Sequence, residues 1–153
     1  MDRAATEVRF YHCTRSPAID VALQLAARAH STGERLLILA ATEALEVLDR
    51  RLWAEPADSF LPHGLLGDAE WAPEQPILLA DRLEPVNGAR LLLLVAQPLP
   101  PALEGFARVF HLFEDASEAH LRAREEWKAL AARADLRRSY WQQTAAGRWQ
   151  EKG

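Results

Sequence analysis

Two short apolar runs near the start of the chain decide its fold: Val8-Arg-Phe-Tyr-His-Cys13 and Arg35-Leu-Leu-Ile-Leu-Ala40. Each run is predicted to be a buried β-strand. Between them, Ser16 and Pro17 are typical of a helix start, with serine as the N-cap and proline in the first turn. Apolar residues then recur at helical spacing, and Gly33 suits the end of this helix. A strand, a helix and a strand in this order predict parallel strands joined by a right-handed crossover.

The middle of the chain continues this alternation. Thr42 is placed to cap a second helix, which Pro56 would end. Three further strands are expected, at residues 77–80, 90–96 and 108–113. The first two of these either form an antiparallel hairpin or lie apart in the sheet, because only a short connection with a turn signal joins them.

The C-terminal part has the clearest helical pattern, over residues 116–134. We expect a shorter helix and a loose tail over residues 136–149, so that a helical segment spans 116–145 and a loose tail spans 146–153. Together the elements predict one α/β domain over residues 1–153. It would have three layers around a central, mostly parallel (mixed) sheet of about five strands.

The composition excludes several classes of protein. The chain has 153 residues, a formal net charge of −4 and one cysteine, Cys13. A lone cysteine excludes an intramolecular disulfide and a cysteine-built zinc site, and it is expected to be a small buried hydrophobe. The longest apolar run is far shorter than the roughly 18 residues of a membrane span, and no signal peptide is readable. We therefore expect a cytoplasmic protein that does not associate with membranes.

The charge is unevenly distributed. Residues 1–115 contain 10 arginines against 17 acidic residues, whereas residues 116–149 contain 7 basic residues against 4 acidic ones. An acidic body argues against a general nucleic-acid coat. The basic C-terminal end keeps open the alternative of a protein that binds single-stranded nucleic acid directly.

No known catalytic or nucleotide-binding motif is present. The turn after the first strand lacks glycine, and no phosphate-binding loop occurs. The fold is thus expected to be Rossmann-like without the nucleotide-binding Gly-rich loop. The five histidines lack metal-binding spacing, so we expect no metal, cofactor or catalytic residue. One enzyme alternative remains, a small cytosolic enzyme with a loop site centred on His63, although a histidine that ties down the loop backbone is the simpler interpretation.

The predicted C-terminal helix carries a candidate binding face. His120, Arg124, Trp127 and Lys128 share one side of it, beside an apolar stripe that would face the body. Basic groups beside an aromatic surface suit a ligand with a carboxylate and an apolar group, such as an acidic peptide ending in a hydrophobic residue. A solvated charged helix face is the alternative.

A second candidate surface is the stretch from Leu52 to Gly64, where large aromatics leave a helix end and enter a proline-rich loop. If exposed, these aromatics would form a docking patch. If buried, they would cover an edge of the core.

The same segments resemble the chi subunit of bacterial DNA polymerase III, a clamp-loader accessory protein. The most specific one, Leu52-Trp53-Ala-Glu-Pro-Ala-Asp-Ser-Phe60-Leu-Pro-His63, is similar to the LWxxPxxSFxPH block of that family. Gly33-Glu-Arg35-Leu-Leu-Ile38 is similar to its second-strand entry. Ala123-Arg124-Glu-Glu-Trp127-Lys128 resembles its C-terminal helix motif. The resemblance runs from Val8 to Trp141.

This resemblance implies a non-catalytic adaptor that works within a DNA-directed DNA polymerase complex. It implies two direct partners: the psi subunit, which tethers chi to the clamp loader, and the acidic C-terminal tail of single-stranded DNA-binding protein. It implies neither a cofactor nor direct contact with DNA. The psi-facing residues that it implies are Trp53, Phe60, Leu61 and Pro62. The tail-binding residues that it implies are Arg124, Trp127, Lys128 and His120, with Val109 and His111 flanking the pocket.

Overall fold

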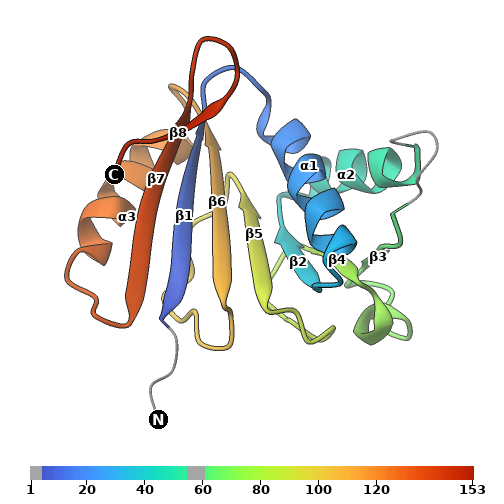
Figure 1. Ribbon diagram of the computed structural model, residues 1–153. Helices are drawn as coiled ribbons and strands as arrows, with labels where there is room; N and C mark the ends of the chain where they lie inside the picture. Colours follow the sequence, from blue (N-terminus) through green and yellow to red (C-terminus); the bar gives the residue numbers. More distant parts are fainter. Residues whose placement is uncertain (1–4, 55–60) are drawn as a thin grey trace.

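One sheet organises the described part of the chain, residues 5–54 and 61–153 of the computed structural model (Figure 1). Its strands are β1 (Thr6–Cys13), β2 (Leu36–Leu39), β3 (Gly64–Leu65), β4 (Ile77–Ala80), β5 (Leu91–Val95), β6 (Arg108–Glu114), β7 (Leu136–Gln143) and β8 (Trp149–Glu151). Their order across the sheet is β3-β4-β2-β5-β6-β1-β7-β8. Neighbouring strands are parallel except for β7 and β8, so the prediction of a mostly parallel α/β sheet is confirmed.

Helices cover both faces of this sheet. They are α1 (Ala18–Ser31), α2 (Thr42–Ala54) and α3 (Glu118–Leu130), with a short 3₁₀ turn, η1 (Ala72–Glu74). Buried residues of α1 and α2 belong to one core cluster, and those of α3 belong to the other. In Figure 1, α1 and α2 accordingly lie on the opposite side of the sheet from α3.

The central strands are apolar on both faces because both faces are covered. In β2, Leu36 and Ile38 pack into the cluster under α1, whereas Leu37 and Leu39 pack into the cluster that includes α3. Strand β5 divides its leucines in the same way. A continuous apolar run is typical of a parallel strand buried on both faces, which is why these runs were readable from the sequence.

Strands 77–80 and 90–96 lie apart, so of the two arrangements left open by the sequence the hairpin is wrong. Strands β4 and β5 flank β2, and each is parallel to it. The connection between them passes Asn87, a buried residue whose side chain donates to the carbonyl oxygens of Leu36 and Gln75 at 3.3 and 2.9 Å. The connection, residues 81–90, thus runs back to the edge of the sheet where β2 begins, and Asn87 fixes it there.

The predicted second C-terminal helix and loose tail are wrong. Residues 136–143 form β7, parallel to β1, and the chain then turns back as β8. Leu136 and Tyr140 pack on the α3 side of the sheet, whereas Trp141 packs on the α1 side. Side chains that alternate between two faces require a strand, since successive residues of a strand point in opposite directions. With these two strands and the short β3, which was also not predicted, the sheet has eight strands in the described residues, more than the five expected.

Helix α3 starts one residue after its cap. The Ser117 Oγ accepts a hydrogen bond from the backbone N–H of His120 at 3.1 Å, as an N-cap serine does. The apolar stripe predicted for this helix comprises Ala119, Ala123, Leu130 and Ala134. The first three are buried, as expected, but Ala134 lies beyond the helix end and is exposed, so this part of the prediction is wrong. None of the helices in the described residues has the length and apolar character needed to cross a membrane.

Candidate functional site

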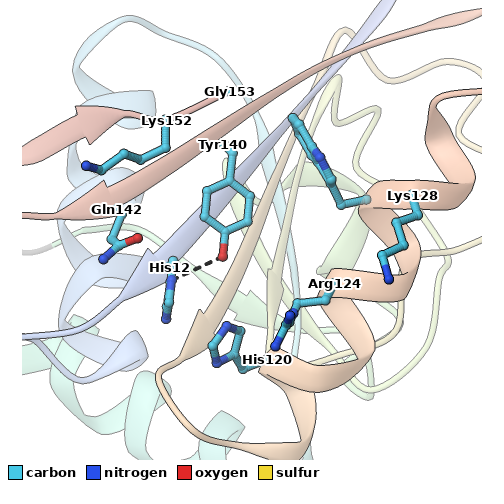
Figure 2. Close-up of a pocket in the computed structure, with 9 residues that line it drawn as sticks. His12, His120, Arg124, Lys128, Tyr140, Gln142, Lys152 and Gly153 are labelled. Atoms are coloured by element: carbon cyan, nitrogen blue, oxygen red, sulfur yellow. Dashed lines mark hydrogen bonds between the residues drawn. The ribbon is translucent and has the colours of Figure 1, made fainter.

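A cavity of about 430 Å³ opens between α3 and the β1–β7 side of the sheet (Figure 2). The residues that line it come from distant parts of the sequence: His12, His120, Arg124, Trp127, Lys128, Tyr140, Gln142, Lys152 and Gly153. The four residues that the sequence placed on one helix face are all among them. The residues contributed by β1, β7 and the C-terminal end were not anticipated.

The register of the sheet explains this convergence. Strand β1 lies between β6 and β7, with His12 beside Gln142 and Phe10 beside Tyr140. Residues 152 and 153 run back along β7, where the N–H of Lys152 donates to the carbonyl oxygen of Tyr140 at 2.7 Å. The pocket therefore has a rigid sheet as its floor and one side, and α3 as the other side.

The pocket is electropositive. Arg124, Lys128 and Lys152 bring three basic side chains to it, and no acidic side chain is among its lining residues in the described part of the chain. The carboxylate of Asp115 lies at the inner end of the pocket and is paired with His12. In the described part of the chain, the Arg124 guanidinium makes no hydrogen bond or ion pair, and its side chain points towards the cavity in Figure 2. Lys128 lies 3.5 Å from Glu125 in a pair that is largely exposed, and such pairs contribute little. These cations are thus available to an anionic ligand.

An aromatic cluster supports the floor of the pocket. The Trp127 ring packs edge-on against Phe10 and Tyr140, with ring centroids 5.3 and 5.6 Å apart. The guanidinium of Arg138 lies over the Trp127 ring, 3.9 Å from its centroid. Contacts of this kind fix the indole in place. The pocket therefore presents an apolar surface of defined shape beside its basic groups.

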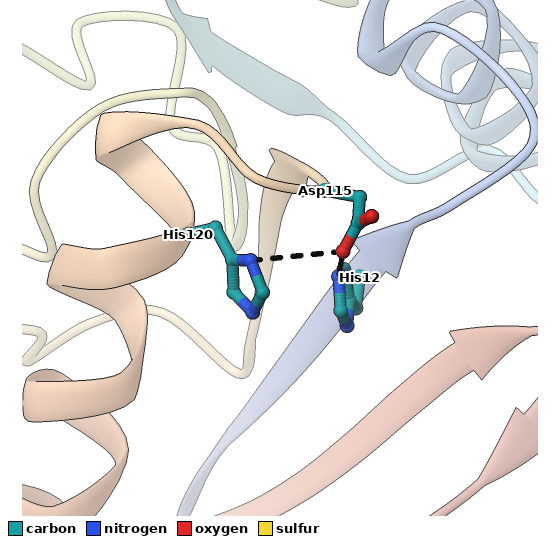
Figure 3. A group of neighbouring side chains, drawn as sticks. All are labelled: His12, Asp115 and His120. Carbon is teal, nitrogen blue, oxygen red and sulfur yellow. Dashed lines mark hydrogen bonds and ion pairs between the residues drawn. The ribbon is translucent and has the colours of Figure 1, made fainter.

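Two histidines and an aspartate form the inner end of the site (Figure 3). The Asp115 carboxylate lies 2.7 Å from the Nε2 atom of His12 and 3.7 Å from the Nδ1 atom of His120. The Tyr140 hydroxyl lies 3.1 Å from the Nδ1 atom of His12. The two imidazole rings lie against each other, with centroids 4.1 Å apart and planes tilted by 41°.

Protonation at this inner end is set by burial and by neighbouring charges. Burial first, and then the His12 ring, lower the pKa of His120; Asp115 opposes this shift and Arg124 adds to it. Burial likewise raises the pKa of the Tyr140 hydroxyl. At neutral pH the His120 ring is therefore neutral, and the Tyr140 hydroxyl keeps its proton.

Val109 and His111, which the resemblance placed beside the pocket, are fully buried. Val109 belongs to the core cluster that α3 covers. The Nε2 atom of His111 lies 2.8 Å from the Glu126 carboxylate of α3, which also accepts the N–H of Leu99 at 2.6 Å. Their burial argues against direct contact of either residue with a ligand. They support the helix that carries the pocket.

The second candidate surface is partly described. Trp53 is 60% exposed near the end of α2, and its ring centroid lies 5.2 Å from that of His63. Leu61 is buried and Pro62 is half-buried, so among the described residues of this segment Trp53 is the most exposed apolar side chain. Phe60 falls outside the described residues. Trp53 belongs to α2, which lies on the opposite side of the sheet from α3 (Figure 1).

His63 has a structural role. It is buried, with its Nδ1 atom 2.8 Å from the carbonyl oxygen of Leu61 and its Nε2 atom 2.8 Å from the Asp49 carboxylate. The interpretation of a histidine that ties down the loop backbone is confirmed. Cys13 is buried as expected, and burial together with the Glu114 charge raises the pKa of its thiol to about 12.

The usual phosphate position of such folds is filled by the protein itself. The first backbone N–H of α1, that of Ala18, donates to the Glu114 carboxylate at 2.8 Å. The side-chain oxygen of Gln143 accepts the N–H groups of Arg15 and Ser16 at 2.9 and 3.0 Å. Because a carboxylate already occupies the helix N-terminus, an anionic phosphate would be repelled there. The blocked helix end and the absence of a Gly-rich turn from the sequence both argue against a phosphate site at the start of α1.

A family model described as DNA polymerase III chi subunit, HolC, matches residues 5–136. The chain belongs to the chi subunit family. One relative, the DNA polymerase III subunit chi of Pseudomonas aeruginosa, is 31% identical over 127 residues, covering 80% of this chain and 87% of the relative. The subunit of the same name from Haemophilus influenzae is 26% identical over 130 residues, covering 82% and 90%.

Membership in the chi family places the chain in DNA replication, as an accessory subunit of DNA polymerase III. The chi match ends at residue 136, where β7 begins. It therefore includes the four pocket residues of α3 together with His12. The part of the pocket formed by Tyr140, Gln142 and Lys152 lies outside the matched residues.

Proposed function

We propose that this chain is a non-catalytic adaptor that binds the acidic C-terminal tail of single-stranded DNA-binding protein in the pocket under α3. The observation that carries this proposal is the Arg124 guanidinium, which has no partner in the described residues and faces a cavity lined by further cations. A guanidinium can hold the terminal carboxylate of a peptide through two parallel hydrogen bonds. Trp127 and Tyr140 provide an apolar surface for the last side chain.

Binding of such a short peptide should be of micromolar order, or about −8 kcal/mol at a Kd of ~1 μM. It should weaken with added salt because exposed cations such as Lys128 and Lys152 act partly through screened attraction. Many tails on one coated DNA strand would then raise the effective affinity.

We further propose that the psi subunit docks on the other side of the sheet, at the Trp53 segment with Phe60, Leu61 and Pro62. The exposure of Trp53 supports this proposal, since large exposed aromatics are frequent anchors of interfaces. Leu61, which is buried, would help to hold the segment that carries the exposed Trp53 in place. Surfaces on opposite faces of one sheet can be occupied together, as an adaptor requires.

The test of the tail site is fluorescence anisotropy of a labelled peptide with the acidic tail sequence. Wild type should bind in a salt-sensitive manner, and Arg124→Ala should weaken binding by at least tenfold, since a charge-assisted hydrogen bond contributes about 1.5–3 kcal/mol. The control is Arg137→Ala, which removes the same charge from an exposed arginine outside the pocket. Equal affinity of the Arg124 variant and wild type would remove this site.

Two alternatives have distinct outcomes. A direct single-stranded nucleic-acid binder would bind naked oligonucleotide saturably and with a steep dependence on salt. A His63-centred enzyme would need a ring nitrogen free for proton transfer, but both nitrogens of His63 lie within hydrogen-bond distance of protein oxygens. The structure favours the adaptor over the enzyme on this ground.

A further inference from the structure

We propose that His12, Asp115 and His120 form a binding site for a divalent transition-metal ion of the Zn²⁺ type. Each residue offers one ligand atom, and these atoms all lie within 4.8 Å of one another. Figure 3 shows both rings gathered around the aspartate carboxylate, which comes from the loop between β6 and α3. The proposal rests on the geometry of these three side chains and does not require the proposed tail binding.

The spacing of the ligand atoms is close to what a metal needs. Nitrogen and oxygen ligands lie about 2.0–2.2 Å from Zn²⁺, so neighbouring ligands of a tetrahedral site are roughly 3.3 Å apart. The separations of the Asp115 carboxylate from His12 Nε2 and His120 Nδ1, 2.7 and 3.7 Å, lie on either side of this value. Asp115 is exposed, so its side chain can shift by the small amount required.

The protonation pattern at His120 suits a metal ligand. Its Nδ1 atom accepts a hydrogen bond from the N–H of Ala116 at 3.1 Å, which places the ring proton on Nε2. The nitrogen that lies 3.7 Å from the Asp115 carboxylate therefore already carries a lone pair. Ala116 is exposed, so water can take over its N–H when a metal occupies that lone pair.

His12 has the outer partner that metal-bound histidines usually have. When its Nε2 atom binds a metal, the ring proton must move to Nδ1, which lies 3.1 Å from the Tyr140 hydroxyl. A hydroxyl can accept a hydrogen bond as readily as it donates one. A polar partner of this kind orients the ring, and its removal typically costs 10–100-fold in metal affinity.

The donor set determines which ion fits. Two imidazoles and one carboxylate suit Zn²⁺, Co²⁺ or Ni²⁺, whereas Mg²⁺ and Ca²⁺ prefer oxygen ligands alone. Three protein ligands leave the fourth position to water or to a ligand in the pocket, because His12 and His120 both line it. The positive charge of Arg124 opposes a cation, so we expect an open site of moderate affinity.

The experiment is calorimetric titration of tag-free, chelator-treated protein with Zn²⁺, without any peptide. We expect one ion per chain, with visible absorption of four-coordinate Co²⁺ as a second readout. Asp115→Ala and His120→Ala should each weaken Zn²⁺ binding at least tenfold, and Tyr140→Phe should weaken it about tenfold. The control is His30→Ala, which removes a histidine at the far end of α1 and should leave binding unchanged.

Each outcome decides for or against the site. Lack of stoichiometric Zn²⁺ binding, or binding that survives both ligand substitutions, overturns the proposal. Asp115 is exposed and His120 is half-buried, so both variants should fold, and their thermal unfolding without metal checks this. Zn²⁺ should raise the Tm of wild type but not that of the two variants. Since no peptide is present, failure here leaves the tail-binding proposal standing.

Discussion

Glu126→Ala should destabilise the fold by about 2–4 kcal/mol, because it removes the acceptor that joins α3 to the sheet. Glu126 accepts from the buried imidazole of His111 at 2.8 Å and from the N–H of Leu99 at 2.6 Å. The other ring nitrogen of His111 already lacks a partner in the described residues. A buried polar group left unpaired costs about 1–3 kcal/mol, and the half-buried Leu99 N–H adds a smaller amount.

The assay is urea unfolding followed by tryptophan fluorescence, comparing midpoints at an unchanged m-value. Glu126→Gln keeps an acceptor without the charge and should lose only about 1 kcal/mol. The matched control is Glu125→Ala, which removes an exposed neighbouring carboxylate and should change stability by less than about 0.5 kcal/mol. A loss for Glu126→Ala no larger than that of this control would refute the reasoning.

Acidification provides an independent check on the same contact. Burial opposes the charged form of Glu126, but His111, the Leu99 N–H and Arg122 outweigh it and hold the pKa of Glu126 below its ordinary range. A carboxyl whose pKa is depressed in the folded state stabilises the fold above its unfolded pKa, and this stability is lost as the pH falls through the folded value. The difference in the free energy of unfolding between wild type and Glu126→Gln should therefore be largest at neutral pH. It should shrink as the pH falls below the ordinary glutamate range, because Glu126 is then protonated in the folded state as well.

Further predictions concern the two proposed surfaces and the core. Lys128→Ala should weaken tail binding about threefold at low salt and less at high salt, as anisotropy titrations would show. Phe60→Ala should weaken psi association while tail affinity stays at the wild-type value; joint loss of both would indicate misfolding instead. One equivalent of Zn²⁺ should raise the affinity for the tail peptide several-fold, and the peptide should raise the affinity for Zn²⁺ by the same factor. The Cys13 thiol, whose pKa is raised to about 12, should react with iodoacetamide only after unfolding.

The central strands and the helices were predictable because their apolar residues form clear local patterns. These patterns are continuous apolar runs in the strands and helical spacing in the helices. The leucines of β2 and β5 are buried on both faces, and the apolar face of α3 contacts one core cluster. Strand β7 carried no such signal, since its sequence, Leu-Arg-Arg-Ser-Tyr-Trp-Gln-Gln, is largely polar. Its strand character comes from aromatics that pack on opposite faces and from pairing with β1, and neither is readable locally.

The candidate site was predictable only where a single helix presents it. His120, Arg124, Trp127 and Lys128 are related by helical spacing, so their common face followed from the sequence. The contact between His12 and Asp115 joins residues 103 positions apart, and it depends on the pairing of β1 with β6. Because the position of β7 was missed, Tyr140 and Gln142 were missed with it.

The way this fold uses its helix ends explains where a ligand can bind. In a related nucleotide-binding arrangement the N-terminus of the first helix would receive a phosphate. Here Glu114 and Gln143 already satisfy that helix end and the turn before it, so an anion gains nothing there. The basic groups are placed instead along the side of α3, over the opposite face of the sheet. An open, side-chain-built pocket of this kind suits an extended peptide with a terminal carboxylate better than a nucleotide, which agrees with the adaptor role that we propose.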